Sequence, residues 1–319
     1  MSPPYQITPT IIKLIASVSE KLGQINAKFL DKPSPKLRKE NRIKTIHSSL
    51  SIEGNTLTEE QITALIENKR IIGPEKDVNE VLNAIRVYDQ LNTFDPKSAT
   101  SFLRAHEILM KGLVSDNGKY RKKSVGIMAG DRIAHMAPPA ENVPHLMNDL
   151  FKYLKTSDEI SLIKSCVFHY EMEFIHPFID GNGRMGRLWQ TLILMKEYPV
   201  FEFIPFENSI HKTQKDYYHA LSQSDKSGSS TPFIEYMLRV IDDSLYKLLD
   251  FKSRILTTED RLSYFSELKK TEFSRKDYMN VFKEISSATA SRDLKKGVDL
   301  GLFHKEGDKT KTVYRFTRF

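Results

Sequence analysis

The chain has 319 residues, 39% of them hydrophobic, so it can bury a sizeable core and form more than one domain. Its net charge of +7 is compatible with nucleotide or nucleic-acid ligands but specifies neither. The single cysteine, Cys166, excludes a disulfide within the chain, and because we find neither a signal-peptide pattern nor an apolar run of about 18 residues, we expect a soluble cytoplasmic protein without a membrane span.

Two amphipathic helices are expected at the N-terminus. Apolar residues recur at helical spacing through residues 7–30, where two prolines then interrupt the pattern. A second helical pattern runs from Leu37 to Ile52, and Gly54 and Asn55 can end it.

Further helices are expected up to residue 114. Thr58 and Gln61 form a capping-box pattern, which predicts a helix start. Residues 76–114 show two more helical patterns separated near Pro96. We interpret this region as scaffold, and His106, on an apolar face, as a packing residue rather than a ligand.

A short β-hairpin is predicted within residues 117–139. β-Prone segments flank a turn at Gly130, Asp131 and Arg132. A hairpin edge with unpaired N–H and C=O groups can add a strand from another segment. The alternative is a solvated basic hairpin without a partner.

The next helix leads directly to the residues with the clearest chemistry. Residues 156–159 carry a capping-box pattern, and an apolar helical pattern follows up to Phe174, which would deliver His176 to a site. We assign no catalysis to the polar residues on this helix, which we expect to pack or to face solvent: His169, Tyr170, Glu171 and Glu173.

An anion-binding turn is predicted after this helix. Gly181 and Gly183 can adopt positive φ angles that let successive N–H groups converge, and Asn182 is the other residue that best tolerates them. The apolar run through residues 188–195 has no breaker, so a helix should start near Asn182 or Gly183. Its N-terminal dipole would add to the anion site.

The side chains around this turn are suited to moving a phosphate-containing group. Arg184 and Arg187 fall on one helical face, where two guanidinium groups can hold adjacent phosphates. Asp180 offers an oxygen ligand to Mg²⁺, which typically takes one or two carboxylates plus substrate phosphates. His176 can accept a proton near neutrality. Together these side chains predict transfer of a phosphate-containing group to a hydroxyl. The alternative without catalytic function is a turn that connects two helices and carries surface arginines.

This stretch resembles the signature of the Fic family, His-x-Phe-x-Asp/Glu-Gly-Asn-Gly-Arg-x-x-Arg. All eight specified positions match within the twelve residues from His176 to Arg187. Most members of that family transfer AMP from ATP to a Ser, Thr or Tyr hydroxyl of a protein. The resemblance therefore implies ATP as substrate, Mg²⁺ as cofactor and a protein target, and it is compatible with self-modification and with a homodimer. It also implies these roles: His176 as general base, Asp180 as metal ligand, Gly181, Asn182 and Gly183 as phosphate cradle, Arg184 and Arg187 as β- and γ-phosphate ligands, and Phe178 as the anchor of the loop.

Residues 49–54 resemble a second sequence element of the Fic family. Ser49, Glu53 and Gly54 match the inhibitory-helix signature Ser/Thr-x-x-x-Glu-Gly/Asn. The resemblance implies that Glu53 pairs with Arg187 and blocks the γ-phosphate site, since a carboxylate and a phosphate compete for one guanidinium. By spacing alone, Glu53 would be an exposed helix-terminal carboxylate.

Two further regions acquire roles only through the resemblance. The hairpin resembles the Fic flap, which aligns the target segment, and this implies target contacts for Ile127, Met128, Ile133 and His135. Tyr217 and Tyr218 lie where Fic proteins contact the nucleoside, with Asp225 nearby, although an aromatic pair at this spacing is also typical of a core.

The C-terminal segment has the pattern of a winged helix. Its expected elements are helices over 260–270, 274–284 and 287–296, followed by two strands at 302–305 and 312–316. From residue 255 onward there are 14 Lys/Arg and 10 Asp/Glu, a surplus of four positive charges. For DNA binding, the candidate contacts are Thr289, Arg292, Lys295, Lys296, Lys309 and Lys311. Against DNA binding are the modest charge, Asp293 and Asp299, and the use of such modules for protein interaction.

The expected protein is mostly α-helical, with a small β-hairpin flap. Its predicted parts are an N-terminal region with the inhibitory helix (1–98), a Fic catalytic core (99–250) and a winged helix (255–319). The predicted function is protein adenylylation, autoinhibited by Glu53. The alternatives are a Fic enzyme that uses another nucleotide or removes AMP, and a DNA-binding regulator.

Overall fold

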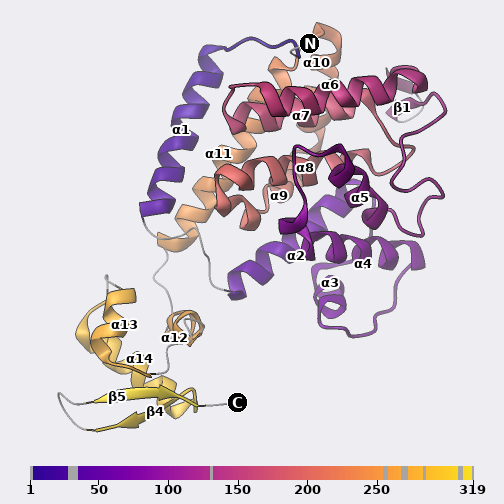
Figure 1. Cartoon of the computed structure of the whole chain (residues 1–319). Coiled ribbons are helices and arrows are strands. Elements are labelled where there is room, and N and C mark those ends of the chain that lie inside the picture. The colour runs from indigo at the N-terminus through magenta and orange to yellow at the C-terminus, as the bar shows by residue number, and fades with distance from the viewer. Residues whose placement is uncertain are drawn as a thin grey trace. The chain divides into compact units, whose positions relative to one another are not determined.

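The computed structural model describes residues 3–27, 35–129, 132–253, 258–266, 272–282, 285–307 and 312–317. The chain divides into two compact units, one of residues 1–32 and 40–249 and the other of residues 33–39 and 250–319. The described residues are predominantly helical, as predicted (Figure 1). None of the helices in these ranges combines the length and apolar character needed to cross a membrane.

The first helix of the larger unit lies along its last one. Helix α1 (Pro9–Ala27) runs beside α11 (Thr231–Ser253) (Figure 1). Lys21 Nζ lies 2.7 Å from Asp242 Oδ1, and Thr8 Oγ1 donates a 2.6 Å hydrogen bond to Glu235. These contacts fasten the N-terminus to an element more than 200 residues away in the sequence.

The helices expected between residues 35 and 110 are present. They are α2 (Pro35–Ile52), α3 (Glu59–Ile66), α4 (Glu75–Asp89) and α5 (Ala99–Leu109), with a 3₁₀ turn at Leu91–Thr93. The predicted capping box is confirmed, because Thr58 and Gln61 each accept from the backbone N–H of the other. Gly54 ends α2 with φ of 91°.

The predicted hairpin is present as two antiparallel strands, β1 (Gly126–Ala129) and β2 (Arg132–Met136). Gly126 pairs with Met136, and the register shifts after Ile127. The tip residues 130 and 131 lie outside the described part of the chain. The same holds for the side chains of Ile127, Met128, Ile133 and His135, so their target contacts stay predictions.

Three helices form the centre of the larger unit. They are α6 (Val143–Thr156), α7 (Ser161–Ile175) and α8 (Asn182–Glu197), and α7 packs along both neighbours (Figure 1). Four buried aromatic rings meet edge-to-face between α5 and these helices, namely Phe102, Phe151, Phe168 and Trp189. Helices α7 and α8 flank the turn at residues 176–181. Their packing therefore fixes the position of the residues from His176 to Arg187 that match the Fic signature.

The predicted capping box at residues 156–159 is wrong. Helix α7 starts at Ser161, and Ile160 precedes it without a side-chain cap. The Glu159 carboxylate instead accepts hydrogen bonds from Tyr5 and Tyr153. The carboxylate that the local pattern assigned to a helix cap is thus bonded to the distant Tyr5 and to Tyr153 on the preceding helix.

The remaining elements of the larger unit connect α8 to α11. They are a 3₁₀ helix at Pro199–Phe203, α9 (Phe206–Lys212) and α10 (Gln214–Ser227). Another 3₁₀ helix, Ala140–Asn142, lies earlier in the chain, between β2 and α6. Gly228 ends α10 in the left-handed conformation. This turn directs the chain into α11.

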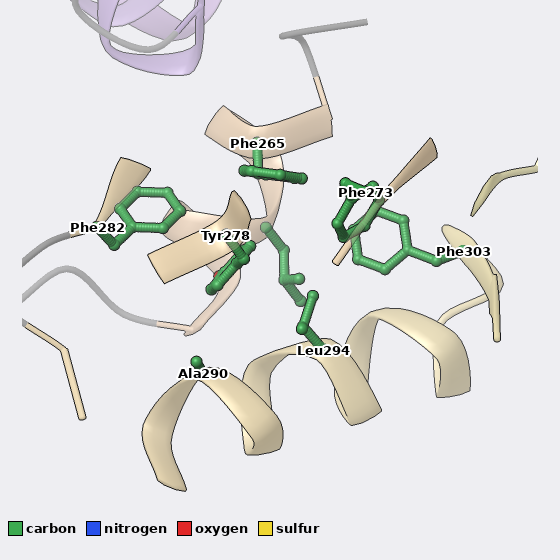
Figure 2. Packing of buried hydrophobic residues seen from close by; sticks show 8 residues of the cluster. Phe265, Phe273, Tyr278, Phe282, Ala290, Leu294 and Phe303 are labelled. Carbon is green, nitrogen blue, oxygen red and sulfur yellow. The ribbon is translucent and has the colours of Figure 1, made fainter. Parts of the chain in front are cut away.

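The smaller unit contains one more strand than the sequence predicts. Helices α12 (Thr258–Ser266), α13 (Arg275–Val281) and α14 (Ser287–Asp299) accompany β3 (Glu272–Phe273), β4 (Phe303–Glu306) and β5 (Val313–Phe316), in sheet order β3-β5-β4. Both expected strands are present as β4 and β5, and β3 was missed because a two-residue strand carries no periodic signal. Its Phe273 belongs to the unit's apolar core, whose rings converge in Figure 2.

A buried ion pair joins two helices of this unit. Arg261 on α12 contacts Asp293 on α14 through Nε at 2.6 Å and Nη2 at 3.0 Å. Tyr278 on α13 donates to the same carboxylate at 3.2 Å. Asp293 is 1% exposed, and its charge is offset within the unit by Arg261.

Candidate functional site

The motif forms a closed turn between α7 and α8. His176 ends α7 in the left-handed conformation with φ of 51°, and its N–H donates to Met172 O. The Asn182 side chain accepts from Phe178 N and donates to Phe178 O, each at 2.9 Å. Asn182 is thus committed to shaping the turn, and its backbone N–H, at the start of α8, is the part that can face an anion.

The two glycines of the turn are constrained differently: Gly181 has the positive φ angle expected for both, whereas Gly183 lies within α8, has no positive φ, and is restricted by its neighbours alone. A Cβ at Gly181, which has φ of 86°, would lie 2.7 Å from Met110 Sδ. A Cβ at Gly183 would lie 2.5 Å from Glu53 Oε1 and 3.1 Å from Arg187 Nη1. Gly183 therefore borders the space between the end of α2 and the second arginine.

Asp180 and Arg184 contact each other at the start of α8. Arg184 Nη2 lies 2.8 Å from Asp180 Oδ1, which also accepts from Gly181 N. Arg184 Nη1 lies 3.1 Å from Glu80 Oε1 on α4, and Arg184 is 4% exposed. The other Glu80 oxygen accepts from Asn55 Nδ2 at 2.8 Å. Glu80 thus links the first arginine of the motif to the residue that follows α2 and Gly54.

Arg187 is fully buried and is held mainly by α2. Its Nε donates to Ser49 Oγ at 3.1 Å, and its Nη2 donates to Ser49 O and Glu53 Oε1, both at 2.8 Å. Nη1 is buried without a hydrogen-bond partner among the described residues. The residues of the two predicted signatures, far apart in sequence, therefore meet at one guanidinium.

Two buried carboxyl groups add to the charge balance around Arg187. Burial and the nearby charge of Glu53 raise the pKa of Glu173 to about 8, and burial raises the pKa of Glu207 to about 8. Burial alone would lower the pKa of Arg187, but the charge and hydrogen bond of Glu53 raise it above its ordinary value. At neutral pH, Glu173 and Glu207 are accordingly neutral neighbours of Arg187, and its ion pair is with Glu53.

The two tyrosines expected near the nucleoside differ in exposure. Tyr217 is 2% exposed, and its hydroxyl lies 3.0 Å from His169 Nε2. Tyr218 is 48% exposed, so it is the member of the pair with a face open to a ligand. Asp225 accepts from Tyr170. His169 also bonds to Gln190 and burial lowers its pKa to about 3, so it packs as a neutral residue, as expected.

His106 supports the motif directly. Its ring stacks on Phe178 with the centroids 3.5 Å apart, and Phe178 stacks in turn on Phe102. The ring nitrogens bond to Asp180 O and Gly118 N, and burial lowers the pKa of His106 to about 4. His106 is a satisfied packing residue, as predicted, but it packs against the motif itself.

Sequence reasoning missed two polar residues that hold the site, Glu80 and Arg121. Glu80 is 5% exposed on α4, and Arg121 is 2% exposed before the hairpin. A charged residue among apolar positions of an amphipathic helix was the available signal for Glu80. Arg121 follows Tyr120 in an irregular segment, where spacing predicts nothing.

A magnesium ion fits Asp180 as a single protein ligand. The described residues contain no group of three or more His, Cys, Asp or Glu side chains that could hold a metal. Both hydrogen bonds given above for Asp180 use Oδ1, so Oδ2 is the oxygen that a cation would take, and the side chain is 47% exposed. One carboxylate with substrate phosphates completing the shell is typical of Mg²⁺.

The chain belongs to the Fic family. Residues 96–194 match the Fic/DOC family, a range that contains the whole motif. The crystal structure of a Fic family protein from Desulfovibrio desulfuricans G20 is 40% identical, with a TM-score of 0.78 over 99% of this chain and 98% of that one. Fic-1 (aa134–508) from C. elegans, 21% identical with a TM-score of 0.63, covers 76% of this chain and 73% of that one, and shows the same fold.

Curated relatives share sequence with most of this chain. Protein adenylyltransferase Fic from Nematostella vectensis is 29% identical over 252 residues, which are 75% of this chain and 56% of the relative. Protein adenylyltransferase fic-1 from Caenorhabditis elegans is 25% identical over 250 residues, 74% of this chain and 47% of the relative. The chain thus spans about half the length of the curated relatives it matches.

Proposed function

We propose that this protein is an adenylyltransferase that moves AMP from ATP to a hydroxyl group of a protein. The observation that carries the proposal is the buried Arg187, whose Nη1 has no partner among the described residues and borders the glycine turn. A desolvated guanidinium beside backbone N–H groups favours a multiply charged phosphate ligand. The names of the curated relatives support the same reaction.

In the proposed reaction, the target hydroxyl oxygen attacks the α-phosphorus of ATP. The bond from that phosphorus to the bridging oxygen breaks, and pyrophosphate leaves. His176 accepts the hydroxyl proton, because it is the partly exposed imidazole at the turn. The N–H groups at Gly181–Gly183 and the guanidinium groups of Arg184 and Arg187 offset the triphosphate charge.

Mg²⁺ would be held by Asp180 together with the phosphates. When bound, the ion would reduce the negative charge of the triphosphate. Asp180 also contacts Arg184 at 2.8 Å, so the carboxylate would hold the Arg184 guanidinium next to the bound ion and the phosphates.

We propose that Glu53 autoinhibits the enzyme. Its carboxylate lies 2.8 Å from Arg187 Nη2 and would lie 2.5 Å from any Cβ at Gly183, so it takes the space beside the turn. An anionic phosphate cannot share this guanidinium without displacing the carboxylate. The Ser49 bonds to Arg187 do not involve a second charge and can persist after displacement.

Self-labelling with isotopic ATP tests the reaction. The Glu53→Gly variant should incorporate label from α-labelled ATP but not from γ-labelled ATP, and Glu53→Gly with His176→Ala should incorporate none. Label from the γ position would indicate phosphate transfer, and persistent labelling without His176 would refute its role as base. Parallel incubations with labelled UTP, CTP and GTP test the alternative nucleotides.

For the smaller unit, we propose a winged helix with α14 facing duplex DNA as a second candidate function. The burial of Asp293 against Arg261 favours this, because Arg292, Lys295 and Lys296 then dominate the exposed face of α14. Lys296 is partly offset by Glu259, and Lys309 and Lys311 lie outside the described residues. The candidate rests on the charge of α14 and on the helix and strand pattern of the unit.

Fluorescence anisotropy with a labelled duplex tests this candidate. Binding should weaken steeply with added salt, because each phosphate contact releases a counterion. Replacing Arg292 and Lys295 with Ala should weaken it further, whereas Arg239→Ala on α11 of the other unit is the matched control. If the anisotropy of the labelled duplex does not change when the protein is added at low salt, DNA binding by this unit is refuted.

A further inference from the structure

The Arg121 guanidinium lies at the centre of a set of backbone carbonyls. Its Nε donates to His176 O at 2.7 Å, and its Nη2 donates to Ile175 O at 3.3 Å. It reaches the hairpin region through Nη1 to Lys123 O at 2.9 Å and Nη2 to Pro138 O at 2.5 Å. The backbone N–H of Arg121 adds a bond to Pro177 O at 2.9 Å.

This is an unusual environment for a cation. Arg121 is 2% exposed, and burial lowers its pKa. The four groups that accept hydrogen bonds from its guanidinium, the carbonyls of Ile175, His176, Lys123 and Pro138, are dipoles and not carboxylates. A buried charge held this way is costly unless most of its donors are satisfied in a fixed geometry. The four carbonyl bonds are therefore what stabilises this buried cation.

One half of the set holds the catalytic turn. The carbonyls of Ile175 and His176 are at the C-terminus of α7, where the helix leaves them without intrahelical partners and where a cation is favourable. His176 has φ of 51°, a left-handed conformation that is strained for a non-glycine residue. Arg121 offsets this strain by bonding the carbonyl of the strained residue itself.

The other half of the set holds both ends of the hairpin. Lys123 precedes β1, which starts at Gly126, and Pro138 follows β2, which ends at Met136. The contacts to Lys123 and Pro138 therefore clamp the two ends of the hairpin on one guanidinium. Because that guanidinium also contacts His176, the hairpin base and the turn share one anchor.

We propose that Arg121 is a positioning residue that sets the hairpin in register with His176, so that a target hydroxyl presented along the hairpin reaches the imidazole. The inference rests on the proposed function. It assigns to Arg121 a role in target alignment and none in nucleotide binding, since the contacts given above include no residue from 180 to 187. Lysine cannot replace it, because an ammonium has three donors on one atom and cannot reach four carbonyls at separate positions.

The test compares Arg121→Lys with Arg239→Lys, a matched change at an exposed arginine paired with Glu235. Both changes are made in the Glu53→Gly protein. Three quantities are measured: hydrogen exchange of the amides in Gly126–Ala129 and Arg132–Met136, the dissociation constant for ATP, and self-labelling from α-labelled ATP at saturating ATP.

For Arg121→Lys we expect at least tenfold faster exchange in the hairpin, at least tenfold slower self-labelling, and an ATP dissociation constant within threefold of the parent. Amides of α8 should exchange as in the parent, and Arg239→Lys should change none of these. A purely structural role would instead lower ATP binding and α8 protection together with labelling, which would overturn the proposal. Unchanged hairpin exchange would overturn it as well. If the parent itself fails to label, the proposed function fails, and hairpin exchange alone then decides whether Arg121 anchors the hairpin.

Discussion

Arg187 and Glu53 form an ion pair of 2.8 Å between Nη2 and Oε1, although they lie 134 residues apart in the sequence. The guanidinium is fully buried, whereas the carboxylate side chain is 28% exposed. The exposed partner is thus the one that can leave while Arg187 stays in place. Departure of Glu53 would leave Arg187 a buried cation without its charged partner, a state that a phosphate would stabilise.

Glu53→Gln should raise the affinity for ATP at least tenfold. The amide keeps the size of the side chain but removes the negative charge that competes with the γ-phosphate. Calorimetric titration with a non-hydrolysable ATP analogue in the presence of Mg²⁺ measures the change. Glu60→Gln, at an exposed carboxylate on the nearby α3, is the control for loss of one acidic group. Equal affinities in Glu53→Gln and the parent would contradict competition for Arg187.

Glu80→Gln should weaken ATP binding in the Glu53→Gly protein by about three- to tenfold. Glu80 accepts from Arg184 at 3.1 Å and from Asn55 at 2.8 Å, and an amide can accept at one of its two ends only. The loss of one charge-assisted bond corresponds to roughly 1 kcal/mol or more. Lys76→Ala is the matched control, because Lys76 lies 4.0 Å from Glu80 but does not contact Arg184. Lys76→Ala should leave the affinity for ATP within twofold of the parent, and an unchanged affinity in Glu80→Gln would contradict a role for Glu80 in positioning Arg184.

The sequence predicted the helices and the approach of Glu53 to Arg187 for different reasons. The helices followed from apolar periodicity and from caps such as Thr58 and Gln61, which act within a few residues. The Glu53–Arg187 pair followed only from resemblance to a family, because no local rule brings residues 134 positions apart together. Its regulatory role stays a prediction.

The residues that sequence reasoning missed act over long distances. Glu80 and Arg121 each contact the motif from another element, and a single sequence carries no signal for such contacts. The predicted cap at Glu159 was wrong partly for the same reason, since its carboxylate bonds to Tyr5, 154 residues away, as well as to the nearer Tyr153. Strand β3 was not predicted, because two residues are too few to show the alternation of apolar and polar residues typical of a strand.

Glu173 should make the protein less stable as the pH rises. Its pKa is raised to about 8 in the folded protein, first by burial and then by Glu53, against an ordinary value of 4.5. Between these two values the folded state holds a proton that the unfolded state has released, so stability falls as pH increases. Below pH 4.5 both states are protonated, and this contribution no longer changes.

Glu173→Gln removes that titration and should reduce the loss of stability between pH 5 and pH 8. Urea unfolding at several pH values, followed by circular dichroism, measures the free energy of unfolding. Glu53→Gln is an informative companion, because removing its charge lowers the pKa of Glu173 and should shrink the same pH dependence partially. An identical pH dependence in Glu173→Gln and the parent would show that the carboxyl is already ionised in the folded state.

Gly186→Ala should destabilise the protein by about 1–3 kcal/mol, the usual cost of overpacking a core. The added Cβ would lie 2.6 Å from His169 Cδ2 and 2.9 Å from Glu173 Oε1, where α7 and α8 approach closely. Gly23→Ala on α1 is the opposite case, because its Cβ meets nothing within 4 Å. We expect it to stabilise the protein by roughly 0.5–1 kcal/mol. Urea denaturation of both variants measures the contrast, and equal effects would refute the close approach.

Asp293→Asn should destabilise the smaller unit by about 3–5 kcal/mol, because it leaves the buried Arg261 without its charged partner. The contacts at 2.6 and 3.0 Å and the bond from Tyr278 place this carboxylate at the junction of three helices. The only tryptophan, Trp189, is buried in the larger unit, so its fluorescence reports unfolding there, while far-ultraviolet circular dichroism reports both units. We expect an early loss of dichroism in Asp293→Asn with the Trp189 transition unchanged. Asp299→Asn, at an exposed position on the same helix, is the control, and a parallel shift of both signals in Asp293→Asn would mean that the two units unfold together.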